Sequence, residues 1–406
     1  MKQYYKSLLP FIIFLVIFQY VVIRAVDLRR PCHHDECHFV ETINLFGKEM
    51  NLNTIIHYNE MSTPLPFVLY ALWGRIFGFE LYVLRILSII IAFATYIIFH
   101  KLLFDIFSNS LTPFLIAAFF AVNPYFVGFS VFVYTDMLGI FFMLICCISM
   151  IRQKPIMFTI SSAAMLLCRQ HYIFFFAASF VYYLAKLATV RKMSSFYMLL
   201  SCIISLLPML TLFIAWGGLV PDNSVRTLYM SEGLFFHPNY LTLYVGQFFV
   251  YLLPFVIFKW RSLYKDLRVT IGCFIFSWTY WLFPVAVSKC SRLNTVGIFH
   301  RYLEMISNNW FFVQVVFFIA FFLGLPVVFN VMRDCYHKWR HGNVDFKFFL
   351  NLSILIFLVI MPFSYLVWEK YFLQLAPLVA IRILLLRYPD EFIEAKRLHD
   401  CRPKLY

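Results

Sequence analysis

Long apolar runs separated by short polar loops dominate this sequence, and they constrain its fold more than any single motif. Charged residues make up 13% of the 406 positions, whereas a soluble globular chain has about a quarter. A spanning helix takes ~20 apolar residues, so the chain has room for about ten to twelve spans and for no large soluble domain. We therefore predict an all-α, polytopic transmembrane bundle that forms one membrane domain over residues 1–406.

The basic residues between the apolar runs predict the topology. The expected spans lie at 8–25, 80–100, 111–123, 136–150, 156–168, 171–186, 197–216, 243–258, 269–288, 310–332, 348–366 and 371–386. If they alternate, the Lys- and Arg-rich loops all fall on the side of the N-terminus, which the positive-inside rule makes cytosolic, together with the tail 387–406. The short runs 156–168 and 171–186 have an alternative interpretation as a re-entrant hairpin with Arg169 at its tip.

The first outer loop, residues 27–79, concentrates the unusual polar residues. Its centre is the acidic pair Asp35 and Glu36, followed by His38. Two adjacent carboxylates beyond a membrane helix suit proton removal, because one can take a proton while the other orients it or holds a substrate. The structural alternative is a solvated loop with ordinary surface charge. The end of the loop, from His57 to Phe79, is expected to lie along the membrane interface as short amphipathic helices.

Two cysteines flank the acidic pair and raise the question of a disulfide or a metal. A disulfide between Cys32 and Cys37 fits an oxidising compartment. Zinc is the alternative because three histidines lie close by, although the spacing matches no usual structural zinc pattern. The five cysteines within apolar runs, such as Cys146, are expected to behave as small hydrophobic residues.

The remaining outer loops hold further candidate site residues. Thr135 or Asp136 is either a helix N-cap or a substrate ligand, together with Tyr134. Arg169 and Gln170 lie between two apolar segments, where a guanidinium needs an acidic side chain or an anionic ligand as its partner. The later loops supply Asp222, His237, Gln247, Arg301, Glu369 and Lys370. Cations beside carboxylates at a membrane surface suit a lipid phosphate held next to a proton acceptor.

The order of these motifs resembles that of a known group of enzymes. The similar stretches are Asp35-Glu36 with His38-Phe39, Met61-Ser62-Thr63-Pro64-Leu65-Pro66, Leu84-Arg85, Tyr134-Thr135-Asp136, Arg169-Gln170, Asp222-Asn223-Ser224 with Gln247, and Glu369-Lys370-Tyr371-Phe372. Together they are similar to the C-type-fold membrane glycosyltransferases (GT-C), which use polyprenyl-phosphate sugars. Within that group the resemblance is to the dolichyl-phosphate-glucose α-1,2-glucosyltransferases of N-glycosylation.

The resemblance implies transfer of a hexose, glucose first, from a polyprenyl- or dolichyl-phosphate donor to a hydroxyl of a lipid-linked or surface glycan. The implied reaction is an inverting single displacement on the lumenal or outer face, with Asp35 and Glu36 as base and orienting partner in either order. Arg169, with Lys370 or Arg301, is expected to neutralise the leaving phosphate. Substrate-binding roles are expected for His38, Tyr134, Asp136, Gln170, Asp222, His237, Gln247 and Glu369. No cofactor is expected, with a divalent metal at Asp35 and Glu36 as the alternative.

Two other classes compete with the enzyme. A polytopic lipid or solute transporter also places charges between helices, although this chain shows no internal repeat and its polar residues gather on one side. A non-catalytic membrane subunit is the third class. The expected location is the endoplasmic reticulum membrane for a eukaryotic chain and the inner membrane for a bacterial one. The sequence leaves the donor sugar, the acceptor and the lipid open.

Overall fold

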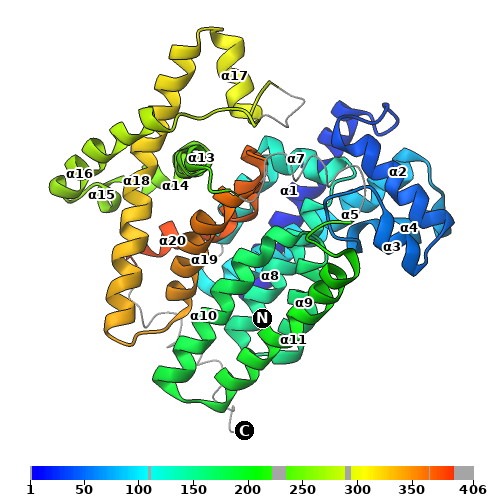
Figure 1. The fold of residues 1–406 in the computed structure, drawn as a ribbon, viewed down its shortest axis with the longest axis horizontal. Coiled ribbons are helices and arrows are strands. Elements are labelled where there is room, and N and C mark those ends of the chain that lie inside the picture. Colours follow the sequence, from blue (N-terminus) through cyan, green and yellow to red (C-terminus); the bar gives the residue numbers. More distant parts are fainter. Residues whose placement is uncertain (1, 108–110, 222–234, 289–293, 365, 388–406) are drawn as a thin grey trace. The chain divides into compact units, whose positions relative to one another are not determined.

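A computed structural model describes the chain except residues 1, 108–110, 222–234, 289–293, 365 and 388–406. Every regular element in the described part is an α-helix or a 3-10 helix, which confirms the predicted all-α fold. The chain divides into two compact units, one formed by residues 1–176 and 193–228 and the other by residues 177–192 and 229–406 (Figure 1). The sequence predicts a single membrane domain. The two units are described one after the other.

Long apolar helices confirm a multi-pass integral membrane protein. In the described residues, six helices are long and apolar enough to cross a membrane, or seven if one bent pair counts as a span. The six are Tyr4–Val26, Leu81–Phe107, Gln170–Val190, Met193–Trp216, Trp310–Arg340 and Phe346–Phe363. The bent pair joins Leu111–Val122 to Pro124–Val131 at 73°. Other expected spans are shorter helices here, such as the 12-residue helix Pro155–Leu166.

The first unit surrounds the long helix α5. Its elements are α1 (Lys2–Val26), α2 (Asp35–Lys48), α3 (Leu52–His57), α4 (Leu65–Phe77), α5 (Leu81–Phe107), α6 (Leu111–Val122), α7 (Pro124–Val131), α8 (Asp136–Arg152), α9 (Pro155–Leu166), η1 (Gln170–Tyr172), the start of α10 (Ile173–Val190) and α11 (Met193–Trp216). Helix α5 packs against α1, α6, α7 and α8, and α9 packs between α8 and α11. The first outer loop forms α2, α3 and α4, drawn in blue in Figure 1.

The second unit is organised around α18. Its elements are the rest of α10, α13 (Pro238–Val250), α14 (Leu253–Phe258), α15 (Trp260–Leu263), α16 (Leu267–Ser277), η2 (Trp278–Leu282), α17 (Ile298–Ile306), α18 (Trp310–Arg340), α19 (Phe346–Ile360), η3 (Met361–Phe363), η4 (Glu369–Gln374), α20 (Ala376–Leu384) and η5 (Leu385–Arg387). Helix α18 packs against α13, α16 and α19. Close packing requires a small residue at one crossing, because a Cβ on Gly324 would lie 1.9 Å from the Val245 carbonyl oxygen.

Candidate active site

The start of α2 is fixed by a buried ion pair between Glu36 and Arg85 of α5. The Arg85 guanidinium donates to the Glu36 carboxylate from Nε at 2.9 Å and from Nη2 at 2.6 Å. Its other N–H groups donate to the carbonyls of Leu28, Arg30 and Pro31. Both charged side chains are fully buried. A guanidinium presents five N–H donors in a rigid fork, so this pairing fixes the backbone before α2 as well as the carboxylate.

This arrangement places the two adjacent acids in different surroundings. Glu36 accepts from Arg85 and from the backbone N–H groups of Val133 at 3.0 Å and His33 at 3.3 Å. Glu36 is therefore a fully buried carboxylate whose two oxygens both accept from N–H donors. The choice of base between Asp35 and Glu36 stays a prediction, and of the two acids Glu36 is the one held by buried donors.

Asp35, one residue before the buried Glu36, is partly exposed to solvent. Its side chain is 38% exposed and lies 3.9 Å from Nε2 of His38, measured to Oδ1. The other ring nitrogen of His38, Nδ1, is hydrogen-bonded to Glu60 Oε1. His38 is half exposed, whereas Glu60 is buried with 7% of its side chain exposed. Two carboxylates therefore contact the two nitrogens of one imidazole ring.

The charges of this trio follow from burial and from these contacts. Burial lowers the pKa of His38, but the contacts with Asp35 and Glu60 outweigh it and raise that pKa to about 9. Both ring nitrogens therefore carry protons at neutral pH. The Nδ1–H group donates to Glu60, and Nε2 faces Asp35 at the 3.9 Å of an ion pair. Burial raises the pKa of the Glu60 carboxyl, which His38 and Arg169 oppose. At neutral pH, His38 is thus an imidazolium between two acidic groups.

Arg169 extends the same network. Its guanidinium donates to Asp136 Oδ2 from Nη2 at 2.8 Å and to Thr135 Oγ1 from Nε at 2.8 Å. Thr135 makes no side-chain cap to the first turn of α8, so the expected cap by Thr135 is wrong. An acidic side chain or an anionic ligand was expected as the partner of Arg169, and the structure shows an acidic one, Asp136. The charge of Arg169 also acts on Glu60, which connects it to His38 and Asp35.

Hydrogen bonds to backbone carbonyls hold the outer loop against the C-terminal end of α9 and connect it through Gln170 to Leu219, after α11. The Thr63 hydroxyl donates to the Leu166 carbonyl at 3.0 Å, and the Leu65 N–H donates to the Leu167 carbonyl at 3.0 Å. Gln170 donates to the carbonyls of Met61 and Leu219, so its amide connects two segments of the chain. Its substrate-binding role stays a prediction. Tyr134 packs its ring against Phe39 of α2, with the ring centroids 6.0 Å apart.

Cys32 and Cys37 form the predicted disulfide, which encloses the acidic pair. His34, within this short loop, has a φ of 49°, a left-handed conformation that a residue with a Cβ rarely adopts. The disulfide takes both sulfur atoms out of the set of metal ligands. In the described residues, no three His, Cys, Asp or Glu side chains converge as a metal site. Glu36 is directed at Arg85, so the donor set does not fit a metal shared by Asp35 and Glu36.

The candidate residues of the second unit differ in their surroundings. Glu369 is fully buried and accepts from the Tyr251 hydroxyl at 2.5 Å and from the first N–H groups of α17, Phe299 at 2.9 Å and His300 at 3.0 Å. It stabilises the N-terminus of α17, and its substrate-binding role stays a prediction. Lys370 lies 5.8 Å from the centre of the Trp368 ring, and Arg301 is exposed on α17.

Two other candidates of this unit have buried polar atoms without a hydrogen-bond partner in the described part of the chain. Both amide atoms of Gln247 on α13 are buried with no hydrogen-bond partner in the described part of the chain. His237 stacks on Tyr240 with the ring centroids 4.6 Å apart, and its Nε2 is likewise buried without a described partner. Such groups are expected to be satisfied by a ligand or by water. Asp222 lies outside the described residues.

Two residues that complete the site were given no role from the sequence: Glu60, and Arg85 of the Leu84-Arg85 stretch. Glu60 is a lone carboxylate, 22 positions beyond His38, and only the folded loop brings it to the imidazole. Arg85 is a cation within an otherwise apolar span, and such a residue requires a partner. That signal could have assigned Arg85 to a carboxylate of the neighbouring outer loop.

Comparison with known proteins gives a distant structural likeness. No protein-family profile matches the chain, and no curated protein matches it. Among solved structures, the chain is similar to the crystal structure of ArnT from Cupriavidus metallidurans in the apo state. The identity is 12%, the TM-score is 0.40, and the alignment covers 95% of this chain and 78% of that one. A likeness at this level does not assign a function.

Proposed function

We propose that this chain is a membrane glycosyltransferase that uses a polyprenyl-phosphate-linked sugar. The donor sugar is a hexose, glucose first, and the acceptor is a hydroxyl of a lipid-linked or surface glycan on the outer or lumenal face. The observation that carries the proposal is the separation of the acidic pair: Glu36 is locked in the interior, and Asp35 is left accessible beside an imidazolium. The order of motifs that resembles the dolichyl-phosphate-glucose α-1,2-glucosyltransferases supports the choice of donor.

In the proposed reaction, Asp35 is the general base. The acceptor hydroxyl loses its proton to the Asp35 carboxylate as its oxygen attacks the anomeric carbon. The bond between that carbon and the phosphate oxygen breaks, and the polyprenyl phosphate leaves with the electron pair. Attack and departure on opposite faces invert the anomeric centre.

The remaining residues of the network orient the base and compensate charge. The His38 imidazolium holds Asp35 in one orientation, and buried Glu60 fixes the ring from its other side. Negative charge grows on the phosphate as the bond breaks, so a nearby cation stabilises the transition state more than the ground state. Arg169 is the candidate cation within this network, and Asp136 orients its guanidinium. Lys370 and Arg301 remain predictions for the same role.

The test is sugar transfer in membranes that contain the full chain, with a glucose-bearing polyprenyl phosphate as donor. Asp35→Asn is expected to lower transfer by at least ~100-fold, the usual range for loss of a general base. Glu41→Gln is the matched control, because Glu41 is an exposed carboxylate of the same helix α2. Equal losses in the two variants, or unchanged transfer by Asp35→Asn, would refute the assignment. A donor series with mannose in place of glucose tests the sugar separately.

A further inference from the structure

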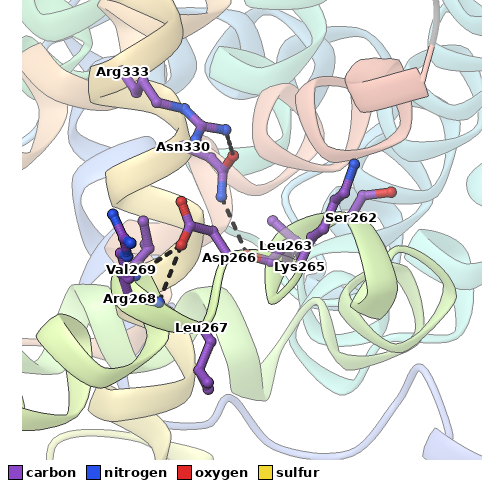
Figure 2. A pocket seen from close by; sticks show the side chains of 9 residues that line it. All are labelled: Ser262, Leu263, Lys265, Asp266, Leu267, Arg268, Val269, Asn330 and Arg333. Atoms are coloured by element: carbon purple, nitrogen blue, oxygen red, sulfur yellow. Dashed lines mark hydrogen bonds between the residues drawn. The ribbon is translucent and has the colours of Figure 1, made fainter.

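A second polar site lies in the other unit, where a cavity opens beside α18. The cavity has a volume of about 670 Å³. Figure 2 shows its lining coming from two segments: the turn from Ser262 to Val269, which leads into α16, and the residues Asn330 and Arg333 of α18. The two segments are joined by the Asn330 amide, which donates to the Pro326 carbonyl at 2.8 Å and to the Leu263 carbonyl at 3.5 Å.

Three cations line this cavity against one carboxylate. The cations are Lys265, Arg268 and Arg333, and none of them forms an ion pair within the described residues. The carboxylate is Asp266, which caps α16 by accepting from the N–H groups of Arg268 at 3.0 Å and Val269 at 3.4 Å (Figure 2). Arg333 donates to the Asn330 side-chain oxygen at 3.1 Å, which orients its guanidinium. The cavity therefore presents excess positive charge and several N–H donors.

The cavity lies where the apolar stretches of two helices end. From Trp310 to Met332, α18 contains no charged residue, and Arg333 is the first one. From Val269 to Ser288 the chain again contains no charged residue, and Arg268 is the last one before it. The exposed tryptophans Trp260 and Trp339 fit the aromatic belt of a membrane interface. The positive-inside rule predicts that this side is cytosolic.

An apolar strip leads away from the cavity along α16. Leu267 lines the cavity and is 70% exposed, and Ile271 and Ile275 follow at four-residue spacing with 49% and 66% exposure. Residues four apart share one helix face, so these side chains form a continuous apolar surface. Acyl chains can lie on this surface while a headgroup occupies the basic cavity.

We propose that this cavity binds the phosphate headgroup of an anionic phospholipid of the cytosolic leaflet. Lys265, Arg268 and Arg333 supply the charge, and the strip of α16 takes the acyl chains. A smaller cavity of about 330 Å³ shares Arg333 and also contains Lys347 and Arg382, which extends the basic surface. Those two cations face Asp334, at 3.8 Å and 3.0 Å, so the unpaired charge lies in the larger cavity. The proposal is independent of the proposed sugar transfer.

The experiment measures lipid binding to the purified full chain by native mass spectrometry. Phosphatidylglycerol and phosphatidylcholine with the same acyl chains are titrated against wild type and three variants, Lys265→Ala, Arg268→Ala and Arg333→Ala. Each lost cation is expected to weaken phosphatidylglycerol binding by roughly 5-fold, from the attraction of one basic residue to an anionic surface. Arg261→Ala and Arg340→Ala are the matched controls, because both residues are exposed in the same basic segments but line neither cavity.

The outcomes separate the lipid from other sources. Weaker phosphatidylglycerol binding by the three variants and unchanged binding by the controls support the site. Equal affinity for the two lipids, or equal losses in variants and controls, overturns it. A third arm adds inorganic phosphate. If the same three variants weaken the binding of that ion, and the chain shows no preference for phosphatidylglycerol, the cavity is assigned to a soluble phosphate instead. Arg268→Lys, which keeps the charge, is expected to retain binding. It shows that the loss in Arg268→Ala comes from the missing charge and not from misfolding.

Discussion

Replacing Glu36 by glutamine tests the distinction between the two neighbouring acids most directly. The change keeps the side-chain volume but removes the charge opposite a fully buried guanidinium. One carboxylate oxygen becomes an NH2 group, which then faces donors, since Oε1 accepts from Arg85 Nε and Val133 N, and Oε2 accepts from Arg85 Nη2 and His33 N. Glutamine can satisfy only one of these two pairs.

The expected cost is that of a buried ion pair broken on one side, ~3–5 kcal/mol. The entropy of unfolding is about 2.1 cal/mol/K per residue, or roughly 0.85 kcal/mol/K for the 406 residues, so this cost is expected to lower the midpoint of thermal unfolding by roughly 4–6 °C. The assay is thermal unfolding of the purified chain in detergent, monitored by tryptophan fluorescence. Because Asp35 is partly exposed, Asp35→Asn is expected to keep its midpoint within ~2 °C, as surface substitutions usually do.

Sugar transfer measured on the same preparations completes the test. Asp35→Asn is expected to be folded and inactive, whereas Glu36→Gln loses activity in proportion to its loss of folded protein. The double variant Glu36→Gln with Arg85→Gln removes both charges and is expected to recover part of the midpoint, because a buried unpaired charge costs more than a neutral pair. The reasoning is refuted if Glu36→Gln keeps the wild-type midpoint and still abolishes transfer, since Glu36 would then act on the substrate.

Two further predictions concern the surroundings of Asp35. The midpoint of thermal unfolding is expected to fall as the pH rises from about 6.5 through about 9, because the raised pKa of His38 contributes stability that is complete below 6.5 and lost as the ring deprotonates near 9. The raised pKa of Glu60 also makes the midpoint fall with rising pH, but at lower pH. His38→Gln is expected to flatten the dependence of the midpoint on pH between 6.5 and 9. An unchanged slope in this variant would contradict the role of His38. Cys32→Ser is expected to lower transfer more than the folded yield, because the disulfide is the covalent closure of the short loop that contains Asp35. Equal transfer by wild type before and after thiol reduction would exclude this.

The polytopic all-α fold followed from the sequence because the bilayer imposes a length and an apolarity on each span. The first helix, expected at 8–25, is α1 (Lys2–Val26), and the run expected at 310–332 begins α18 (Trp310–Arg340). The Cys32–Cys37 disulfide was also predictable, since the two residues are close in sequence. The contacts between Arg169 and Asp136 and between His38 and Glu60 were not, because each joins elements whose pairing depends on tertiary packing.

The acidic pair shows how two residues adjacent in sequence come to lie in different surroundings. Successive residues of a helix point about 100° apart, so two neighbouring acids at its start cannot both face one substrate. One of them must turn toward the protein, and Arg85, 49 positions later and inside a span, selects Glu36. The side chain that shares a face with Asp35 is His38, at the i,i+3 spacing of a helix. In the proposed reaction, the pair that acts is therefore Asp35 with His38, and Glu36 serves by placing the helix that carries them.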